Sequence, residues 1–239
     1  MTDVKKPLQK LKTEQNPSQN TFMCIESYAP PVNVVMDSVI EAISNRRSVR
    51  SYEQKTVPKD ILNKIIEAGN QAPFTSITRS QPWRFVVVED KEFKQKLFQT
   101  AFPFWKNATD GMKEQYPELY EMATCLYNAM DKPKDVIYYN APVIIFVIGP
   151  ATGGAISCAL ACENMMIAAT SFGLGSCYTG FGAMVKGNPE VVKALELKEN
   201  EQIYGPILVG YPKNTPTAAV SDALERICAI KKEPITKWI

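Results

Sequence analysis

Apolar and polar positions along the chain separate a polar N-terminal arm from a longer region whose pattern predicts helices and strands. Residues 1–35 are polar, and the Asn16-Pro17 and Ala29-Pro30-Pro31 steps cannot continue a helix or a central strand. From residue 36 to residue 239, apolar positions recur at helical spacing or in short runs, with no linker between them. We therefore predict an arm over residues 1–35 and one domain over residues 36–239 that ends in a C-terminal tail, Lys213–Ile239.

Three apolar runs have the length and the flanking residues of buried strands. They are Arg84–Val88, Val143–Ile148 and Ile203–Val209. The second run is apolar throughout, which is typical of a central strand covered on both faces. Pro206 interrupts the third run and favours a bulge or an edge there.

Helical spacing predicts two short amphipathic helices before the first strand. Val39, Ile40 and Ile43 share one face of the first helix. The second helix carries an apolar stripe from Ile61 to Ala68, and Gly69 can end it.

A third helix is predicted over Ile156–Phe172, which is nearly all apolar and dense in Ala, Cys and Met. Glu163 and Asn164 interrupt its apolar surface, so we interpret it as the central buried helix of a soluble domain rather than a membrane span. Its small residues permit close helix packing, including packing across a dimer axis. Strands that alternate with helices indicate an α/β or α+β sandwich.

The segment between the first two strands is rich in aromatic residues. Lys91–Thr100 has a helical pattern, but the periodicity beyond it is poor, and we expect short helices there. Two interpretations remain open: a lid or binding wall, or an ordinary helical hairpin with one packed face.

Composition restricts the chemistry of the protein. The chain has a net charge of +2, so no global field indicates nucleic acid or a membrane. It contains no histidine, which excludes Ser-His and Cys-His nucleophilic catalysis and His-ligated metal sites, and we predict no metal. The six cysteines form no CxxC pair, and the first 20 residues lack the apolar stretch of a signal peptide. We expect a cytoplasmic protein with reduced cysteines.

The stretch Arg46-Arg47-Ser48-Val49-Arg50 concentrates cationic side chains after the first helix. Arginine is a permanently charged fork of donors that matches phosphate and carboxylate geometry, so the stretch is a candidate anion cradle. The alternative is a solvated helix end, where cations favour the C-terminal dipole.

The order and spacing of three stretches resemble the FMN-dependent nitroreductase family, and the resemblance covers residues 36 to 212. The stretches are Arg46–Arg50, Ala72-Pro73 with Gln81–Phe85, and Glu163–Ala169 with Gly173–Cys177 and Gly210–Pro212. The resemblance implies an α+β sandwich, with a central mixed or antiparallel sheet flanked by helices, and FMN at the interface of an intertwined homodimer. It also implies ping-pong hydride transfer from NADH or NADPH to FMN and on to an organic acceptor such as a nitroaromatic or a quinone.

The same resemblance implies cofactor contacts at particular residues. Arg46 and Ser48 match phosphate contacts, Arg47 lies between them, and Arg50 matches the basic residue near the flavin N1 and O2 edge. A fixed cation at that edge stabilises reduced flavin. Because the flavin carries the chemistry, no side chain is expected to be catalytic. The remaining matches lie in loops: Pro73, Phe74, Thr75, Ser76, Tyr178, Thr179, Gly180 and Lys213.

The sequence departs from the family pattern in its loops and at the phosphate site. Phe74 replaces a small polar residue, so Thr75, Ser76 or Thr78 would take over the polar contact, and the gap from Pro73 to Gln81 is longer than usual. Thr179 stands where some relatives have a carboxylate. Lys213 is the single cation where many relatives carry a basic pair, so either Arg47 compensates or phosphate binding is weaker.

Other function classes remain open at this point. The chain could be an FMN store, chaperone or redox sensor without turnover, or a relative that uses reduced flavin for fragmentation or dehalogenation. A nucleic-acid role is the weakest alternative, because no basic stripe interleaved with aromatics accompanies the arginines.

Overall fold

The computed structural model describes residues 36–74, 81–128 and 135–213. The predicted arm, residues 1–35, lies outside the described residues, so its boundary stays a prediction. Within the described ranges, no helix combines the length and the apolarity that a bilayer crossing requires.

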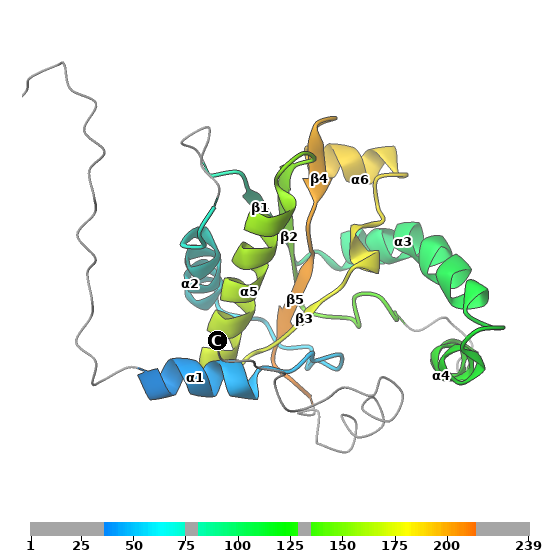
Figure 1. Cartoon of the computed structure of the whole chain (residues 1–239), viewed down its shortest axis with the longest axis horizontal. Coiled ribbons are helices and arrows are strands. Elements are labelled where there is room, and N and C mark those ends of the chain that lie inside the picture. The colour runs from blue at the N-terminus through cyan, green and yellow to red at the C-terminus, as the bar shows by residue number, and fades with distance from the viewer. Residues whose placement is uncertain (1–35, 75–80, 129–134, 214–239) are drawn as a thin grey trace, which may run out of the picture. The chain divides into compact units, whose positions relative to one another are not determined.

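An antiparallel sheet of five strands forms the middle of the described region (Figure 1). Strand β2 (Val143–Pro150) pairs with β1 (Arg84–Val88) on one side and with β5 (Ile207–Gly210) and β4 (Glu201–Ile203) on the other. Strand β3 (Gly175–Tyr178) pairs with the free side of β5. The order β1-β2-β5-β3 makes β2 the central strand that its apolar run predicts.

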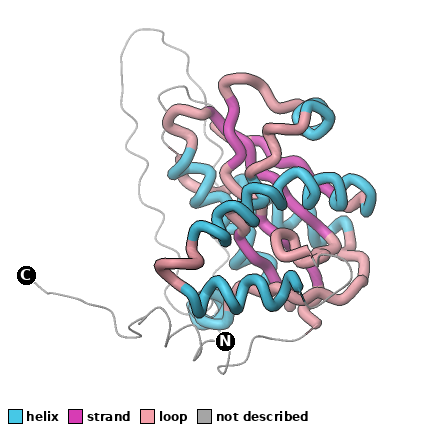
Figure 2. The backbone as a smooth tube through the Cα atoms, turned by 90° about the vertical axis from the view of Figure 1, so that its right-hand side faces the viewer, coloured by secondary structure: helices cyan, strands magenta, loops and turns pink. Residues whose placement is uncertain are grey.

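Helices cover both faces of this sheet, as Figures 1 and 2 show. Their bounds are α1 (Met36–Asn45), α2 (Lys59–Asn70), α3 (Lys91–Gly111), α4 (Pro117–Asn128), α5 (Ala155–Ser171), the 3₁₀ turn η1 (Phe181–Ala183) and α6 (Pro189–Ala194). Strand β2 divides its side chains between the two faces. Ile144, Phe146 and Ile148 pack in the core that contains residues of α3 and α6. Val143, Ile145 and Val147 pack in the core that contains residues of α2 and α5.

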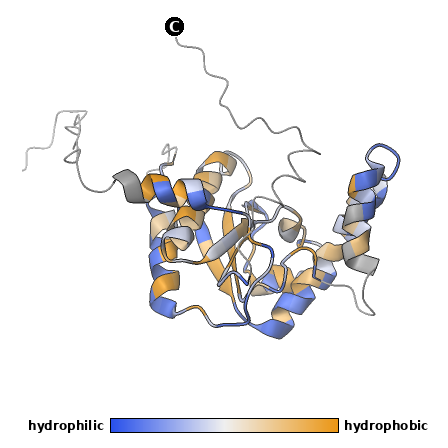
Figure 3. Ribbon diagram, turned by 90° about the horizontal axis from the view of Figure 1, so that it is seen from below, coloured by the Kyte–Doolittle hydropathy of each residue, from blue (hydrophilic) through white to orange (hydrophobic). Residues whose placement is uncertain are grey.

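This arrangement confirms the predicted α+β sandwich with helices on both faces. In Figure 3 the apolar colour concentrates on the strands in the interior of the described region. The run Arg84–Val88 is β1 without change, and the predicted helix Ile156–Phe172 is α5 within one residue at each end.

Three sequence predictions are wrong in detail. The aromatic segment does not break into short helices, because α3 continues to Gly111 with Pro103 inside it. Along α3 the Phe102 ring stacks on Trp105 and meets Phe98 at a tilted angle, and all three side chains pack against the core.

The predicted strand Ile203–Val209 is two strands, β4 and β5, separated at Gly205-Pro206. Proline has no N–H to donate to a ladder, so the pairing with β2 stops and resumes around it. Gly69 does not end α2; it lies inside the helix and faces α5. A Cβ at Gly69 would lie 2.6 Å from Met165 Cγ and 3.3 Å from the Ala161 carbonyl oxygen, so the glycine allows the two helices to approach closely.

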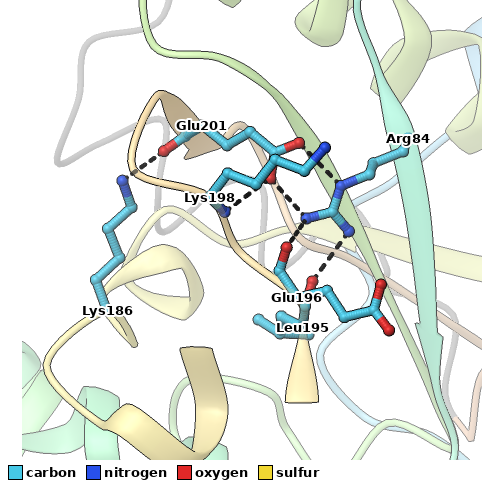
Figure 4. A network of polar contacts seen from close by, with 6 residues as sticks. All are labelled: Arg84, Lys186, Leu195, Glu196, Lys198 and Glu201. Carbon is cyan, nitrogen blue, oxygen red and sulfur yellow. Dashed lines mark hydrogen bonds and ion pairs between the residues drawn. The ribbon is translucent and has the colours of Figure 1, made fainter. Parts of the chain in front are cut away.

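A polar network joins the start of β1 to the segment between α6 and β4 (Figure 4). The Arg84 guanidinium binds both carboxylate oxygens of Glu201, at 3.0 and 2.7 Å. It also donates to the Leu195 and Glu196 carbonyls at the end of α6, at 2.9 Å each. These carbonyls have no partner within the helix, so Arg84 ties the end of α6 to the sheet.

Candidate functional site

The arginine-rich stretch is held as an extended segment along the edge strand of the sheet. The Val49 amide donates to the Ser176 carbonyl of β3 at 2.9 Å, and Ser48 forms an isolated parallel bridge with Ser176. Val49 is buried, and Gly175 makes room for it, because a Cβ at Gly175 would lie 2.7 Å from a Val49 methyl group. The anchored Val49 fixes the positions of Ser48 and Arg50 on either side of it.

The chain that leaves β5 runs along the other side of this segment. Tyr52 forms an antiparallel bridge with Pro212, and the Lys213 amide donates to the Ser51 carbonyl at 3.0 Å. The Tyr52 hydroxyl donates to the Val49 carbonyl at 2.6 Å. Lys213, 163 positions after Arg50 in the sequence, is thereby brought beside the arginine stretch.

The three arginines of the stretch have different surroundings. Arg46 lies 3.7 Å from Glu163 of α5, and both side chains are partly exposed. Arg47 turns back to the end of α1 and donates to the Ser44 and Arg46 carbonyls, at 2.6 and 2.8 Å. A cation in that position satisfies carbonyls that the helix leaves open. Arg50 makes a 3.4 Å contact with the Ser48 carbonyl.

Two polar groups of β3 lie beneath the stretch. Cys177 is buried, and burial raises the pKa of its thiol, while the charges of Arg50 and Arg46 and a hydrogen bond with Ser48 oppose that rise. Ser176 is also buried, and among the described residues its Oγ is the buried side-chain polar atom without a hydrogen-bond partner.

The turn after β3 leaves backbone open at its tip. The Thr179 amide donates to the Pro206 carbonyl at 3.1 Å, and the Thr179 side chain is buried. Gly180 is exposed, and a Cβ there would meet no atom within 4 Å. Tyr178 and Phe181 expose their rings on either side of this turn.

The predicted loop contacts are only partly within the described residues. Pro73 is exposed, and the Phe74 ring packs edge-on against Trp83, with 5.5 Å between ring centroids. Phe74 therefore has a packing partner in its own chain. Thr75 and Ser76 lie outside the described residues.

Sequence reasoning did not single out Tyr139, which the structure places against Arg50. The Arg50 guanidinium carbon lies 5.9 Å from the centroid of the Tyr139 ring. Burial raises the pKa of the Tyr139 hydroxyl, and the charge of Arg50 and a hydrogen bond with it oppose that rise. Tyr139 precedes the Ala141-Pro142 step that starts β2, and this position beside a central strand was the available signal.

The arginines, Ser48 and Lys213 that the fold brings together suit a ligand with an anionic group. Guanidinium groups and a hydroxyl are strong donors to phosphate or carboxylate oxygens. Arg46, Ser48, Arg50 and Lys213 belong to neighbouring extended segments of one sheet edge. The open backbone at Gly180 follows β3, the strand to which the arginine stretch is bonded.

Comparisons with known proteins agree with this geometry. The family model described as the nitroreductase family matches residues 43–211. A Methanothermobacter thermautotrophicus protein described as an NADH dehydrogenase/NAD(P)H nitroreductase is 29% identical over 184 residues, which are 74% of this chain and 79% of that protein. An FMN reductase [NAD(P)H] of Bacillus subtilis is 27% identical over 179 residues, 74% of this chain and 67% of that protein.

A solved structure agrees as well. The nitroreductase with bound FMN from Bacteroides fragilis is 28% identical, with a TM-score of 0.58, and the match covers 83% of this chain and 94% of that chain. The family match spans the sheet, the arginine stretch and the turn at Gly180, and on it this chain belongs to the nitroreductase family.

Proposed function

We propose that the protein is an FMN-dependent oxidoreductase that moves a hydride from NADH or NADPH to an organic acceptor such as a nitroaromatic or a quinone. The observation that carries the proposal is the Arg46–Arg50 segment, held between β3 and the chain after β5 in a member of the nitroreductase family. The names of the relatives support the activity, and the bound FMN of the Bacteroides fragilis protein supports the cofactor.

The residues present fit FMN. A phosphate monoester calls for fixed cations and hydroxyl donors, and Arg46 and Ser48 offer these on one short segment. The unpartnered Ser176 Oγ lies on the strand bonded to that segment, and the open backbone at Gly180 leaves space for a flat group. When bound, FMN supplies the two-electron chemistry that no side chain of this histidine-free protein offers.

The chain's own residues then have separate tasks. Arg46, Ser48 and Lys213 bind the phosphate, while Arg47 stabilises the end of α1. Arg50 supplies positive charge to the part of the ring that gains electrons, where a preorganised cation favours reduction. Pro73, Phe74, Thr75, Ser76 and the turn Tyr178-Thr179-Gly180 stay predicted cofactor contacts.

We also propose that the protein is a homodimer. Val39, Ile40 and Ile43, the predicted apolar face of α1, are 49%, 57% and 46% exposed. Helix α5 is largely apolar, and Ile156 and Leu160 are 75% and 40% exposed in its first turns. A second copy of the chain would cover these faces, as expected for large exposed apolar surfaces.

The described cysteines are all free thiols, which supports the predicted cytoplasmic location.

Phe102 and Trp105 pack on each other and on the core, whereas Phe104 is exposed, so we propose Phe104 as an aromatic contact for the acceptor.

The first experiment is an absorbance spectrum of the purified protein, with the cofactor released by denaturation and identified. We expect a flavin spectrum and recovery of FMN, followed by NAD(P)H oxidation when a quinone or a nitroaromatic is added. A colourless protein that takes up no added FMN would overturn the proposal. A flavin-loaded protein without turnover would instead favour storage or redox sensing.

A second experiment compares Arg46→Ala with Arg47→Ala. We expect Arg46→Ala to weaken FMN binding about tenfold or more, because a charge-assisted phosphate contact is lost. Arg47→Ala should cause a smaller loss, since its guanidinium is engaged by the Ser44 and Arg46 carbonyls. FMN titration by fluorescence quenching measures both, and equal losses would contradict the different tasks given to the two arginines.

A further inference from the structure

Arg50 differs from Arg46 and Arg84 in having no carboxylate partner among the described residues. Arg46 lies 3.7 Å from Glu163, and Arg84 is neutralised by Glu201. Among the described residues no carboxylate lies within ion-pair distance of Arg50. Its neighbours are neutral weak acids, namely Tyr139, Tyr52 and Cys177. Burial raises the pKa of all three groups, so they stay protonated at neutral pH and leave the charge of Arg50 uncompensated.

The loop that carries Tyr139 is built to a fixed shape. Tyr139 and Asn140 both have positive φ angles, of 52° and 51°, which non-glycine residues adopt only at a cost. Asp135 offsets that cost by accepting from the Ile137, Tyr138 and Asn140 amides at 3.1, 2.7 and 3.0 Å.

Three other side chains fasten this loop to the rest of the fold. Lys94 of α3 donates to the Ala141 and Pro142 carbonyls at 2.8 Å each. The Tyr138 hydroxyl donates to the Gly182 carbonyl of η1 at 2.8 Å, and Gln54 donates to the Asn140 carbonyl at 3.0 Å. Helix α3, the η1 turn and Gln54, four residues after Arg50, therefore hold the loop on both sides of Tyr139.

We propose that Tyr139 is the positioning residue for Arg50: loop 135–142 holds the Tyr139 ring against the guanidinium and keeps it as a fixed, uncompensated cation at the cofactor site. A phenol ring suits this task, because its face and its oxygen attract a cation without neutralising it, whereas a carboxylate would cancel the charge. The inference rests on the proposed function, since the charge of Arg50 matters through bound FMN.

The decisive measurement is the midpoint potential of FMN bound to the holoprotein, in Tyr139→Leu, Tyr139→Phe and Arg50→Gln. We expect Arg50→Gln to shift the potential to a more negative value. Tyr139→Leu should shift it in the same direction by a smaller amount, and Tyr139→Phe, which keeps the ring, by less still. Tyr204→Phe removes a hydroxyl that donates to the Pro150 and Ala151 carbonyls, and it should leave the potential unchanged.

A second experiment needs no cofactor and detects the contact between Arg50 and Tyr139 directly. The charge of Arg50 lowers the pKa of the Tyr139 hydroxyl, so Arg50→Gln should raise that pKa in the apoprotein. NMR of protein labelled with ¹³C at the tyrosine ζ carbon follows this titration, with Tyr139→Phe identifying the signal. Cys177 and Asp135, the other charged or titratable groups that act on Tyr139, are unchanged in this comparison.

The outcomes separate the two proposals. Wild-type protein that binds no FMN would overturn the proposed function. FMN-loaded protein in which both Tyr139 variants keep the wild-type potential, while Arg50→Gln shifts it, would overturn the positioning role alone. An unchanged Tyr139 pKa in Arg50→Gln would overturn the contact.

Discussion

Arg84 and Arg50 show how the partner of an arginine decides what its charge does. Arg84 forms an ion pair with Glu201 and donates to two carbonyls at the end of α6. Its charge is therefore neutralised, and its contacts link β1, α6 and β4. Arg50 meets a phenol and keeps its charge. The sequence shows the same residue type in both places, so the difference lies in the groups that folding brings to each.

The first prediction concerns Glu201 and acid. Hydrogen bonds from Arg84 lower the pKa of Glu201 from 4.5 to about 2. A depressed native pKa stabilises the fold above the ordinary carboxyl pKa, and this contribution is lost as pH falls toward about 2. We expect Glu201→Gln to lower the free energy of unfolding by about 1–3 kcal/mol at neutral pH, with the difference from wild type narrowing in acid.

Urea denaturation across the acid range measures this difference. Glu190→Gln is the matched control, because Glu190 also pairs with a cation, Lys96, but its side chain is 72% exposed. Exposed ion pairs contribute little, so this variant should stay close to wild type at every pH. A Glu201→Gln difference that persists undiminished in acid would contradict the role of the pair.

At the scale of elements, the packing of α2 on α5 depends on small residues. Ala161, Cys158 and Cys162 of α5 are buried in the same core as Leu62 and Ile65 of α2. At Gly69 of α2 the two helices lie so close that any side chain would clash with Met165 or crowd the Ala161 carbonyl. The pattern of small residues in α5 predicts close packing, but only the folded structure shows that α5 packs against Gly69 of α2.

The second prediction is that Gly69→Ala destabilises the protein, although alanine favours helix more than glycine. A Cβ at 2.6 Å from Met165 Cγ forces the packed helices apart, and we expect a loss of about 1–3 kcal/mol in urea denaturation. Gly111→Ala is the control, since a Cβ at Gly111 meets no atom within 4 Å and should be neutral or stabilising. Equal stability of the two variants would show that the helix contact tolerates a methyl group.

At the scale of the whole molecule, the exposed apolar faces of α1 and α5 support the proposed homodimer. Of the α1 side chains that the structure describes, Ala42 alone is buried. The predicted apolar face, Val39, Ile40 and Ile43, stays about half exposed among the described residues. The family resemblance implies a homodimer, and the exposed apolar faces of α1 and α5 are the candidate interface.

The third prediction is that Ile156→Asp gives a monomer with weakened FMN binding. Ile156 is 75% exposed in the isolated chain, so the charge should not unfold it, but burying that charge in a dimer interface is costly. Light scattering after size-exclusion chromatography measures the mass of the particle. Tyr116→Asp, at an exposed aromatic away from α1 and α5, should stay dimeric, and a dimeric Ile156→Asp would place the interface elsewhere.

The sequence by itself determined the elements whose periodicity is strong. Strand β1, strand β2 and helix α5 all follow from local pattern, because burial on one or both faces dictates which residue types recur. The sequence failed where tertiary packing overrode a local signal. Pro103 is accommodated inside α3, and Gly69 serves a helix contact rather than a helix end.

For the candidate site, the sequence supplied the Arg46–Arg50 stretch and the family, and only the tertiary structure supplied its surroundings. Pairing of residues 48 and 49 with Ser176, and of 51 and 52 with the chain after β5, joins positions more than 100 residues apart. The placement of Tyr139 against Arg50, and of Arg47 on the end of α1, likewise depends on which groups meet in space. Spacing along a chain carries no record of such long-range contacts, so they became visible only in the folded protein.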